Sequence, residues 1–152
     1  MDEHNANNAP QTVTAYLRVR GATEAIEFYK RAFGAEELFR LQDPGGRIGH
    51  AELKIGNTTI MLADEFPEMN IRGPQSLGGT SVGLALHVAH VDATTSAAAA
   101  AGATIVNPPA DQFYGERTSK LVDPFGHEWH ISTTIEAVSA DEMQKRYSEL
   151  AK

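Results

Sequence analysis

The sequence predicts an α+β fold built from two βαβββ modules. Three observations support this fold: a weak internal repeat with a period of roughly seventy residues, alternating apolar and polar residues in the expected strands, and a glycine that ends the expected helix in both copies. A repeat of this period indicates one folding unit used twice. We therefore expect helices outside, a shared sheet inside, and a cavity between the modules that neither module makes alone.

The first module is expected at residues 12–63, after a polar and flexible start at 1–11. Val13–Val19 has the pattern of a strand. Thr23 can cap the helix that follows, and Gly34 is well placed to end it. The remaining strands are expected at 37–41, 48–55 and 58–62, and the first two are joined by the turn Asp43-Pro44-Gly45-Gly46.

The second module repeats this order over residues 82–133, after a linker at 64–81 that is rich in glycine and proline. Asp92 can cap a helix through the alanine run, and Gly102 can end it. Strands are expected at 82–88, 103–106, 119–122 and 127–132, with an irregular loop at 107–118. Ser139 and Glu142 have the spacing of a capping box, which predicts a tail helix at 139–150. Residues 12–152 then form a single domain.

Composition and charge exclude several classes of protein. The formal net charge of −7 argues against nonspecific binding to nucleic acid or to an anionic membrane. The absence of cysteine excludes disulfides, thiolate metal sites and a cysteine nucleophile. No apolar run approaches the roughly twenty residues of a membrane span, and the start lacks the regions of a secretory signal. We therefore expect a cytoplasmic protein.

Five sequence motifs occur in an order typical of one known superfamily. They are Ala25-Ile26-Glu27-Phe28-Tyr29 with Phe33-Gly34-Ala35, His50-Ala51-Glu52-Leu53 with Ile55-Gly56, Leu77-Gly78-Gly79-Thr80, Phe113-Tyr114-Gly115-Glu116-Arg117 and Asp123-Pro124-Phe125-Gly126-His127. In these motifs the chain resembles the vicinal oxygen chelate superfamily, which includes glyoxalase I, extradiol dioxygenases and the fosfomycin- and bleomycin-resistance proteins. Within it, the chain is most similar to the PhnB-like group. The resemblance implies paired modules that form an open, barrel-like sheet around a cavity, commonly in homodimers.

Metal-using members of this superfamily hold one divalent ion with His and Glu side chains from the first and last strands of each module. The strand patterns put those positions at Thr14, Met61, Gly83 and His130. Only His130 is a good ligand, because divalent metals need three or four converging nitrogen, oxygen or sulfur donors. The sequence therefore predicts no metal site at the family position and assigns no cofactor, although a divalent metal elsewhere stays open.

Strand alternation, anchored on His130, predicts which side chains line the cavity. A neutral imidazole at His130 can serve as a hydrogen-bond partner or base near pH 7, and Glu128 on the same face can orient it. Arg117 offers a planar donor fork for a carboxylate, phosphonate or phosphate, the alternative being an exposed turn with a local ion pair. The catalytic candidates are Glu128 and His130, and the ligand-binding candidates are Tyr16, Arg18, His50, Glu52, Met61, His87, Tyr114 and Arg117.

Two functional classes fit this pattern. The first is a protein that binds a small organic molecule in the cavity without the family metal site. The second is a divalent-metal-dependent lyase, isomerase or dioxygenase with a relocated ligand set, drawn from His50, Glu52, His87, Glu128 and His130. We favour the first because three of the four family positions coordinate poorly. Half-barrel modules leave sheet edges and an apolar face uncovered, so a homodimer is expected, with the tail helix across its interface.

Overall fold

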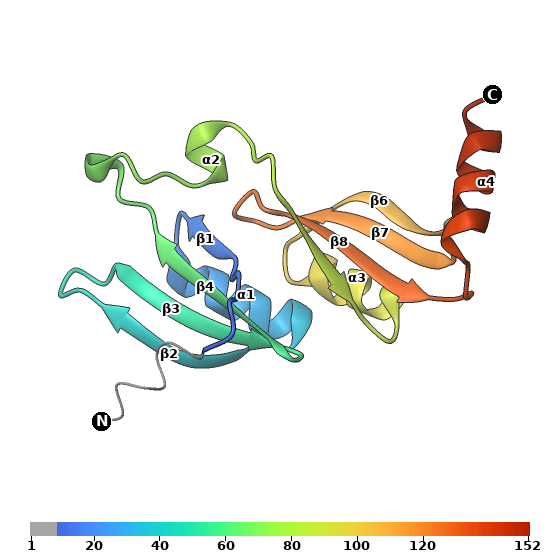
Figure 1. The fold of residues 1–152 in the computed structure, drawn as a ribbon. Helices are drawn as coiled ribbons and strands as arrows, with labels where there is room; N and C mark the ends of the chain where they lie inside the picture. The colour runs from blue at the N-terminus through green and yellow to red at the C-terminus, as the bar shows by residue number, and fades with distance from the viewer. Residues whose placement is uncertain (1–8) are drawn as a thin grey trace.

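The computed structural model describes residues 9–152 and contains both predicted modules (Figure 1). The first eight residues of the start that we predict to be flexible lie outside the described residues. The first module consists of β1 (Tyr16–Val19), α1 (Ala22–Phe33), β2 (Glu36–Gln42), β3 (Ile48–Ile55) and β4 (Thr58–Asp64). The second consists of β5 (Gly83–His87), α3 (Val91–Ala100), β6 (Thr104–Asp111), β7 (Glu116–Val122) and β8 (Glu128–Thr134).

Three short or terminal helices complete the chain. The linker between the modules holds η2 (Pro67–Met69) and α2 (Pro74–Leu77), and the tail forms α4 (Ala140–Leu150). The tail helix begins as predicted, because the Ser139 hydroxyl accepts a hydrogen bond from the Glu142 amide at 3.2 Å. It has no buried residue and extends beyond the end of the second sheet (Figure 1). Among residues 9–152, no helix has the length and apolar character needed to cross a membrane.

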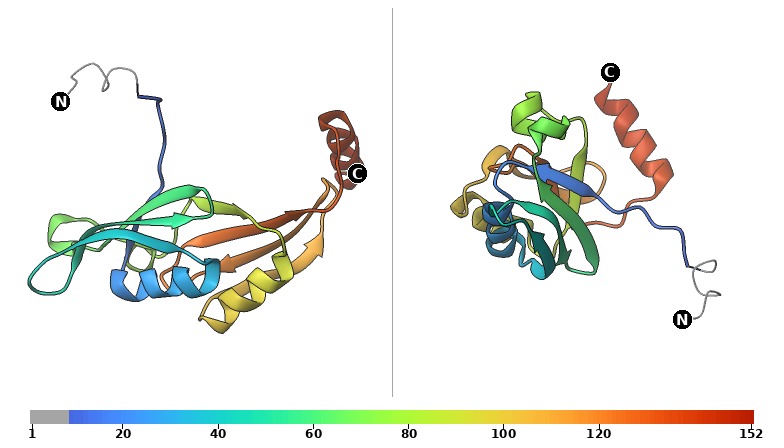
Figure 2. Two further views of the ribbon diagram at one scale, coloured as in Figure 1. Left: turned by 90° about the horizontal axis from the view of Figure 1, so that it is seen from below. Right: turned by 90° about the vertical axis from the view of Figure 1, so that its left-hand side faces the viewer.

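Each module forms one mixed four-stranded sheet. The strand orders are β1-β4-β3-β2 and β5-β8-β7-β6, with the first and last strand of each module paired in parallel. Helices α1 and α3 lie side by side on the same face of the two sheets (Figure 2). The predicted α+β class and its two βαβββ modules are confirmed. The two sheets remain open and form no closed barrel in the described part of the chain.

Aromatic side chains join the two modules in one core. Tyr29 and Phe33 of α1 pack against Trp129 of β8, with ring centroids 5.5 and 4.6 Å apart. Trp129 is 3% exposed and Ile131 is fully buried, so both belong to this core. Burial of aromatic rings contributes strongly to stability, so these contacts stabilise the packing of one module against the other.

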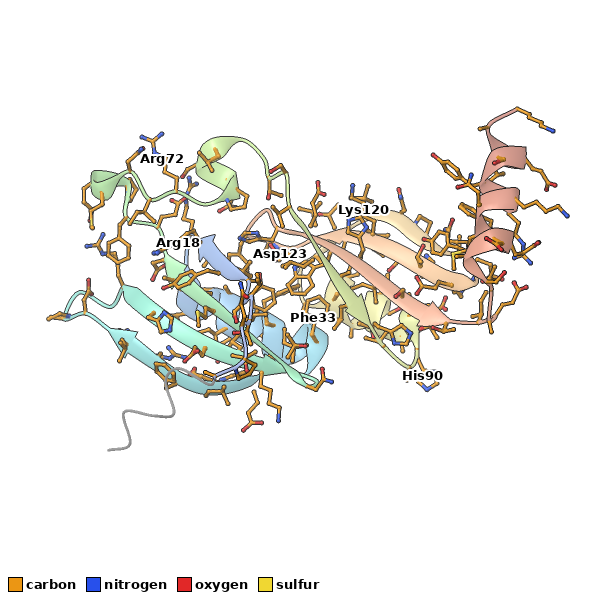
Figure 3. The ribbon with its side chains drawn as sticks, viewed as in Figure 1. Arg18, Phe33, Arg72, His90, Lys120 and Asp123 are labelled. Atoms are coloured by element: carbon orange, nitrogen blue, oxygen red, sulfur yellow. The ribbon has the colours of Figure 1, made fainter. Side chains whose placement is uncertain are left out.

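A buried carboxylate lies where the modules meet. Asp123 Oδ2 accepts hydrogen bonds from the Tyr29 hydroxyl at 2.5 Å and from Trp129 Nε1 at 2.9 Å. Asp123 Oδ1 accepts from the amides of Phe125 and His127 at 2.9 and 3.0 Å. The turn at Asp123, between β7 and β8, therefore also links the modules, since its carboxylate joins α1 to β8; Figure 3 labels Asp123 at this junction.

Both helix starts differ from the prediction. Helix α1 begins after Gly21, and its first amides are bonded by Asp64 Oδ1, at 3.1 Å from Gly21 N and 2.7 Å from Ala22 N. Thr23 is exposed and does not cap it. Helix α3 follows His90, so Asp92 lies inside the first turn instead of capping it. A cap supplied by a residue distant in sequence cannot be found from local spacing.

The irregular loop predicted at 107–118 is mostly strand. β6 continues to Asp111 through Pro108 and Pro109, and β7 begins at Glu116. The pairing of β6 with β7 shifts register between Asn107 and Ala110. Proline, which lacks an amide donor, is tolerated in a bulge of an edge strand, and β6 is an edge strand. The loop prediction was therefore wrong for residues 107–111 and 116–118.

Candidate functional site

The open face of each sheet, meaning the face turned away from α1 and α3, carries most of the predicted site residues. On the first sheet these are Tyr16 and Arg18 of β1, His50 and Glu52 of β3, and Met61 of β4, all half-buried or exposed. Their neighbours in the strands are buried: Leu17, Ala51, Leu53 and Leu62. The alternation used to assign these five residues is therefore present in the structure.

Side chains on the first open face contact one another around His50. The Tyr16 hydroxyl lies 2.8 Å from His50 Nδ1, and Glu52 Oε2 lies 3.9 Å from His50 Nε2. The Arg18 guanidinium lies over the Tyr16 ring, 4.7 Å from its centroid, which is within the range of a cation–π interaction. This arrangement positions a phenol, an imidazole and a guanidinium on one surface.

Two apolar residues of β2 also belong to the first open face. Phe39 pairs with Glu52, and Leu41 pairs with His50; they are 43% and 61% exposed. The Phe39 ring centroid is 5.7 Å from that of His50. Sequence reasoning missed both residues because a register shift between Glu37 and Phe39 interrupts the alternation of β2. Their exposure gives the face an apolar edge that water solvates poorly.

The second open face is hollowed around His130. This hollow has a volume of about 430 Å³ and is lined mainly by β7, β8 and the 112–116 turn. His130 is exposed in it, and Tyr114 of the turn lines it too. The hollow is also lined by polar residues outside the predicted site set: Asn107, Gln112, Glu116, Thr118 and Lys120. Alternation along β7 would have found Thr118 and Lys120, and Ser132, two residues after His130 in β8, lines the hollow as alternation from His130 predicts.

Lys120 changes the role expected for Glu128. The Lys120 ammonium lies 3.5 Å from Glu128 Oε2, and Lys120 pairs with His130 across the β7–β8 ladder. Figure 3 labels Lys120 on the second sheet. The charged group next to Glu128 is therefore the Lys120 ammonium. The sequence analysis had instead expected Glu128 to orient the His130 imidazole. His87, the other predicted imidazole of this sheet, lies at the end of β5 and contacts the Thr134 hydroxyl at 3.0 Å.

Arg117 is on the opposite side of the second sheet from His130. Its guanidinium contacts the Asp92 carboxylate of α3 at 2.8 Å and the Asp111 carboxylate at 3.0 Å. Two hydrogen-bonded carboxylates raise the pKa of Arg117, and Arg117 in turn lowers the pKa of Asp92. Arg117 shares the helix-facing side of β7 with the buried residues Ser119 and Leu121. Of the two roles considered for Arg117, a ligand contact and a local ion pair, the structure shows the ion pair.

The positions that the resemblance assigns to the family metal hold poor ligands. Thr14, Met61 and Gly83 supply no imidazole or carboxylate, which leaves His130 alone. Within residues 9–152, no three His, Asp or Glu side chains of one chain come close enough to share an ion. The relocated set is also divided: His50 and Glu52 are on the first sheet, and His87, Glu128 and His130 are on the second.

The absence of a side chain at Gly83 leaves room for the His130 imidazole. A Cβ at residue 83 would lie 2.8 Å from His130 Nε2, closer than real Cβ contacts allow. We expect Gly83→Ala to displace the His130 imidazole while the free energy of unfolding changes by about 1 kcal/mol or less. Two-dimensional NMR of the histidine ring, together with thermal unfolding, measures both effects. Gly49→Ala is the control, because Gly49 is also in a strand and a Cβ there would meet only the Leu41 carbonyl oxygen, at an ordinary 4.0 Å. Equal shifts of the His130 ring in both variants would refute the explanation.

Comparisons with known proteins agree with this geometry. Residues 10–131 match the family described as the Glyoxalase/Bleomycin resistance protein/Dioxygenase superfamily. The chain therefore belongs to this superfamily, as the sequence motifs had indicated. The uncharacterized protein Rv0887c of Mycobacterium tuberculosis is 41% identical over 146 residues, which cover 94% of this chain and 86% of that protein.

Two solved structures illustrate the shared fold. TioX from Micromonospora sp. ML1 is 26% identical, with a TM-score of 0.64, and the match covers 85% of this chain and 100% of that one. The PhnB protein from Bacillus cereus is 18% identical, with a TM-score of 0.66, and the match covers 82% of this chain and 100% of that one. At such identity the second likeness concerns the fold alone.

Proposed function

We propose that this protein binds a small organic molecule on its open sheet faces and that it does so without the family metal site. The observation that carries the proposal is the hollow of about 430 Å³ around His130. A volume of this size is within the range of ligand sites in proteins. Its polar lining and the poor donors at the family metal positions favour recognition by hydrogen bonds over metal coordination.

The chemistry of the hollow suits a neutral, polar ligand. The imidazole of His130 can donate or accept a hydrogen bond, and the hydroxyls of Tyr114 and Ser132 can do both. Lys120 adds a cation, but Glu128 lies 3.5 Å from it and offsets its charge. We therefore expect hydroxyl, carbonyl or amide groups on the ligand to contact His130 directly.

A second copy of the chain is the expected cover for the open faces. The first face exposes Phe39 and Leu41, and α4, which contacts Phe113 through Arg146 and Tyr147, has no buried residue. Exposed apolar residues and unpartnered amphipathic helices are stabilised when a symmetric partner buries them. We propose a homodimer in the cytoplasm. Sedimentation at micromolar concentration should give about twice the 16.4 kDa chain mass; a species of one chain mass alone would exclude it.

The second candidate function is a divalent-metal-dependent lyase, isomerase or dioxygenase. It would need donors from two chains, because one chain brings no three of them together within residues 9–152. The His50–Glu52 pair, 3.9 Å apart on the first open face, is the observation that favours it. If the open faces of two copies met, this pair and His130 could approach one another.

His130→Ala tests the binding proposal. Wild-type protein should bind neutral probes that carry a hydroxyl or carbonyl group, such as phenol and acetophenone, in a saturable way, measured by saturation-transfer NMR. Removal of the imidazole should weaken binding by about tenfold, the usual effect of losing one ligand hydrogen bond, without altering the circular dichroism spectrum. His90→Ala, an exposed histidine before α3 (Figure 3), is the matched control. Unchanged affinity in His130→Ala, or equal loss in His90→Ala, would contradict the proposal.

A further inference from the structure

A second hollow lies at the junction of the modules, apart from the His130 hollow. It has a volume of about 540 Å³ and is formed by β1, the linker and the start of β5. Two arginines and one histidine line it, whereas no carboxylate does: its charged or titratable lining residues are Arg18, Arg72, His127 and Tyr16. Figure 3 shows Arg18 on β1 and Arg72 in the linker segment above it.

The two arginines of this hollow differ from most others in the chain. Five arginines have a carboxylate within 4 Å: Arg20, Arg40, Arg47, Arg117 and Arg146. Arg18 and Arg72 form no ion pair and no side-chain hydrogen bond with the described residues, although the chain carries a net charge of −7. An acidic protein that leaves two guanidiniums unpaired in one hollow has donors free for an external anion.

A neighbouring aromatic ring orients the Arg18 guanidinium. The Tyr16 ring lies against the Arg18 guanidinium, with the guanidinium carbon 4.7 Å from the ring centroid, and this contact occupies a face of the group and leaves its in-plane N–H donors free. Glu65, the carboxylate that borders the linker here, is already bonded to Gly73 N at 2.7 Å and lies 3.6 Å from Arg20. It is therefore held by groups other than Arg18 and Arg72.

The rest of the hollow is largely apolar. Leu77 and Val82 are 65% and 66% exposed there, and Leu17, Pro74 and Leu84 complete this wall. Apolar side chains next to free guanidiniums suit a ligand with one anionic group and an apolar body. The anion would satisfy the N–H donors, and the body would remove the leucine and valine surfaces from water.

We propose that the junction hollow binds an organic anion, a phosphonate or carboxylate attached to an apolar group, through Arg18 and Arg72. The site shares Tyr16 and Arg18 with the first open face but none of the residues around His130. Binding here and binding at His130 can therefore each fail without the other.

Titration of ¹⁵N-labelled protein with phenylphosphonate tests this site by NMR. Saturable shifts are expected at the amides of 79–84 and at the Nε–H groups of Arg18 and Arg72. Benzoate should shift the same signals, which compares carboxylate with phosphonate, whereas benzamide, its neutral analogue, should not. The affinity should fall as ionic strength rises, because the attraction is between charges.

Variants with a single substitution test whether Arg18 and Arg72 bind phenylphosphonate. Arg18→Gln and Arg72→Gln should each weaken phenylphosphonate binding by about tenfold, as expected for loss of a charge-assisted hydrogen bond. Arg31→Gln removes the same charge from α1, outside the hollow, and should bind like wild type; His130→Ala should too. Wild-type affinity in either Arg18→Gln or Arg72→Gln would overturn the proposal. Equal shifts of the 79–84 amides by benzamide, or an equal loss of affinity in Arg31→Gln, would overturn it too.

Discussion

Replacing Asp123 with alanine is expected to lower the free energy of unfolding by about 3–5 kcal/mol. The carboxylate accepts four hydrogen bonds, from the Tyr29 hydroxyl, Trp129 Nε1 and two backbone amides of its own turn. Asp123 is 4% exposed, so its removal leaves buried donors without an acceptor. Urea unfolding followed by tryptophan fluorescence measures the effect.

Two milder variants separate the contributions at this network. Asp123→Asn keeps an acceptor for the turn amides and should cost about 2 kcal/mol, and Tyr29→Phe should cost about 1–2 kcal/mol. Burial and the nearby Asp123 charge raise the pKa of Tyr29 above its ordinary value. Folding therefore favours the protonated phenol, and its contribution is complete below about pH 10 and declines at higher pH. Tyr29→Phe should lessen that decline; a loss below 1 kcal/mol in Asp123→Ala would contradict this account.

Gly115→Ala is expected to cost about 3 kcal/mol and to disturb the His130 hollow. Gly115 has φ of +90°, and a Cβ there would overlap the carbonyl oxygen of Glu136. Its own carbonyl accepts hydrogen bonds from Ile135 N at 2.9 Å and Glu136 N at 3.1 Å. Because the obstacle is backbone, the 112–116 turn must move, and Tyr114 moves with it.

Gly34→Ala is the matched control for this variant. Gly34 also has positive φ, +66°, but a Cβ there meets nothing within 4 Å. It should cost only the strain of the left-handed conformation, about 1 kcal/mol. Chemical denaturation gives both stabilities, and NMR reports the amides around Tyr114. Equal losses in the two variants would mean that contact with Glu136 is unimportant.

Much of the fold could be predicted from the sequence because local signals agreed with one another. Gly34 ends α1 in the left-handed conformation, and Ser139 caps α4, as their positions had indicated. The start of α1 could not be predicted, because Asp64 caps it from across the module. The extent of β6 was missed since Pro108 and Pro109 fit a register shift at a sheet edge.

The candidate site was harder to predict than the fold, because it depends on strand register. Alternation placed His50 and His130 on open faces, but Arg117 was assigned without regard to register and lies with Asp92 on the helix side. Phe39 was missed because β2 is bulged. Pairing between distant residues, such as Lys120 with Glu128, leaves no local signal in a single sequence.

The central claim is that this member of the superfamily uses its open faces without a bound metal. Elemental analysis of protein purified without a His tag or chelator tests it most directly. Because three of the four family positions are Thr14, Met61 and Gly83, we expect zinc, nickel, manganese and iron each far below one ion per chain. One equivalent of any of these ions per chain, lost together with the imidazole in His130→Ala, would contradict the claim and favour the metal-dependent enzyme.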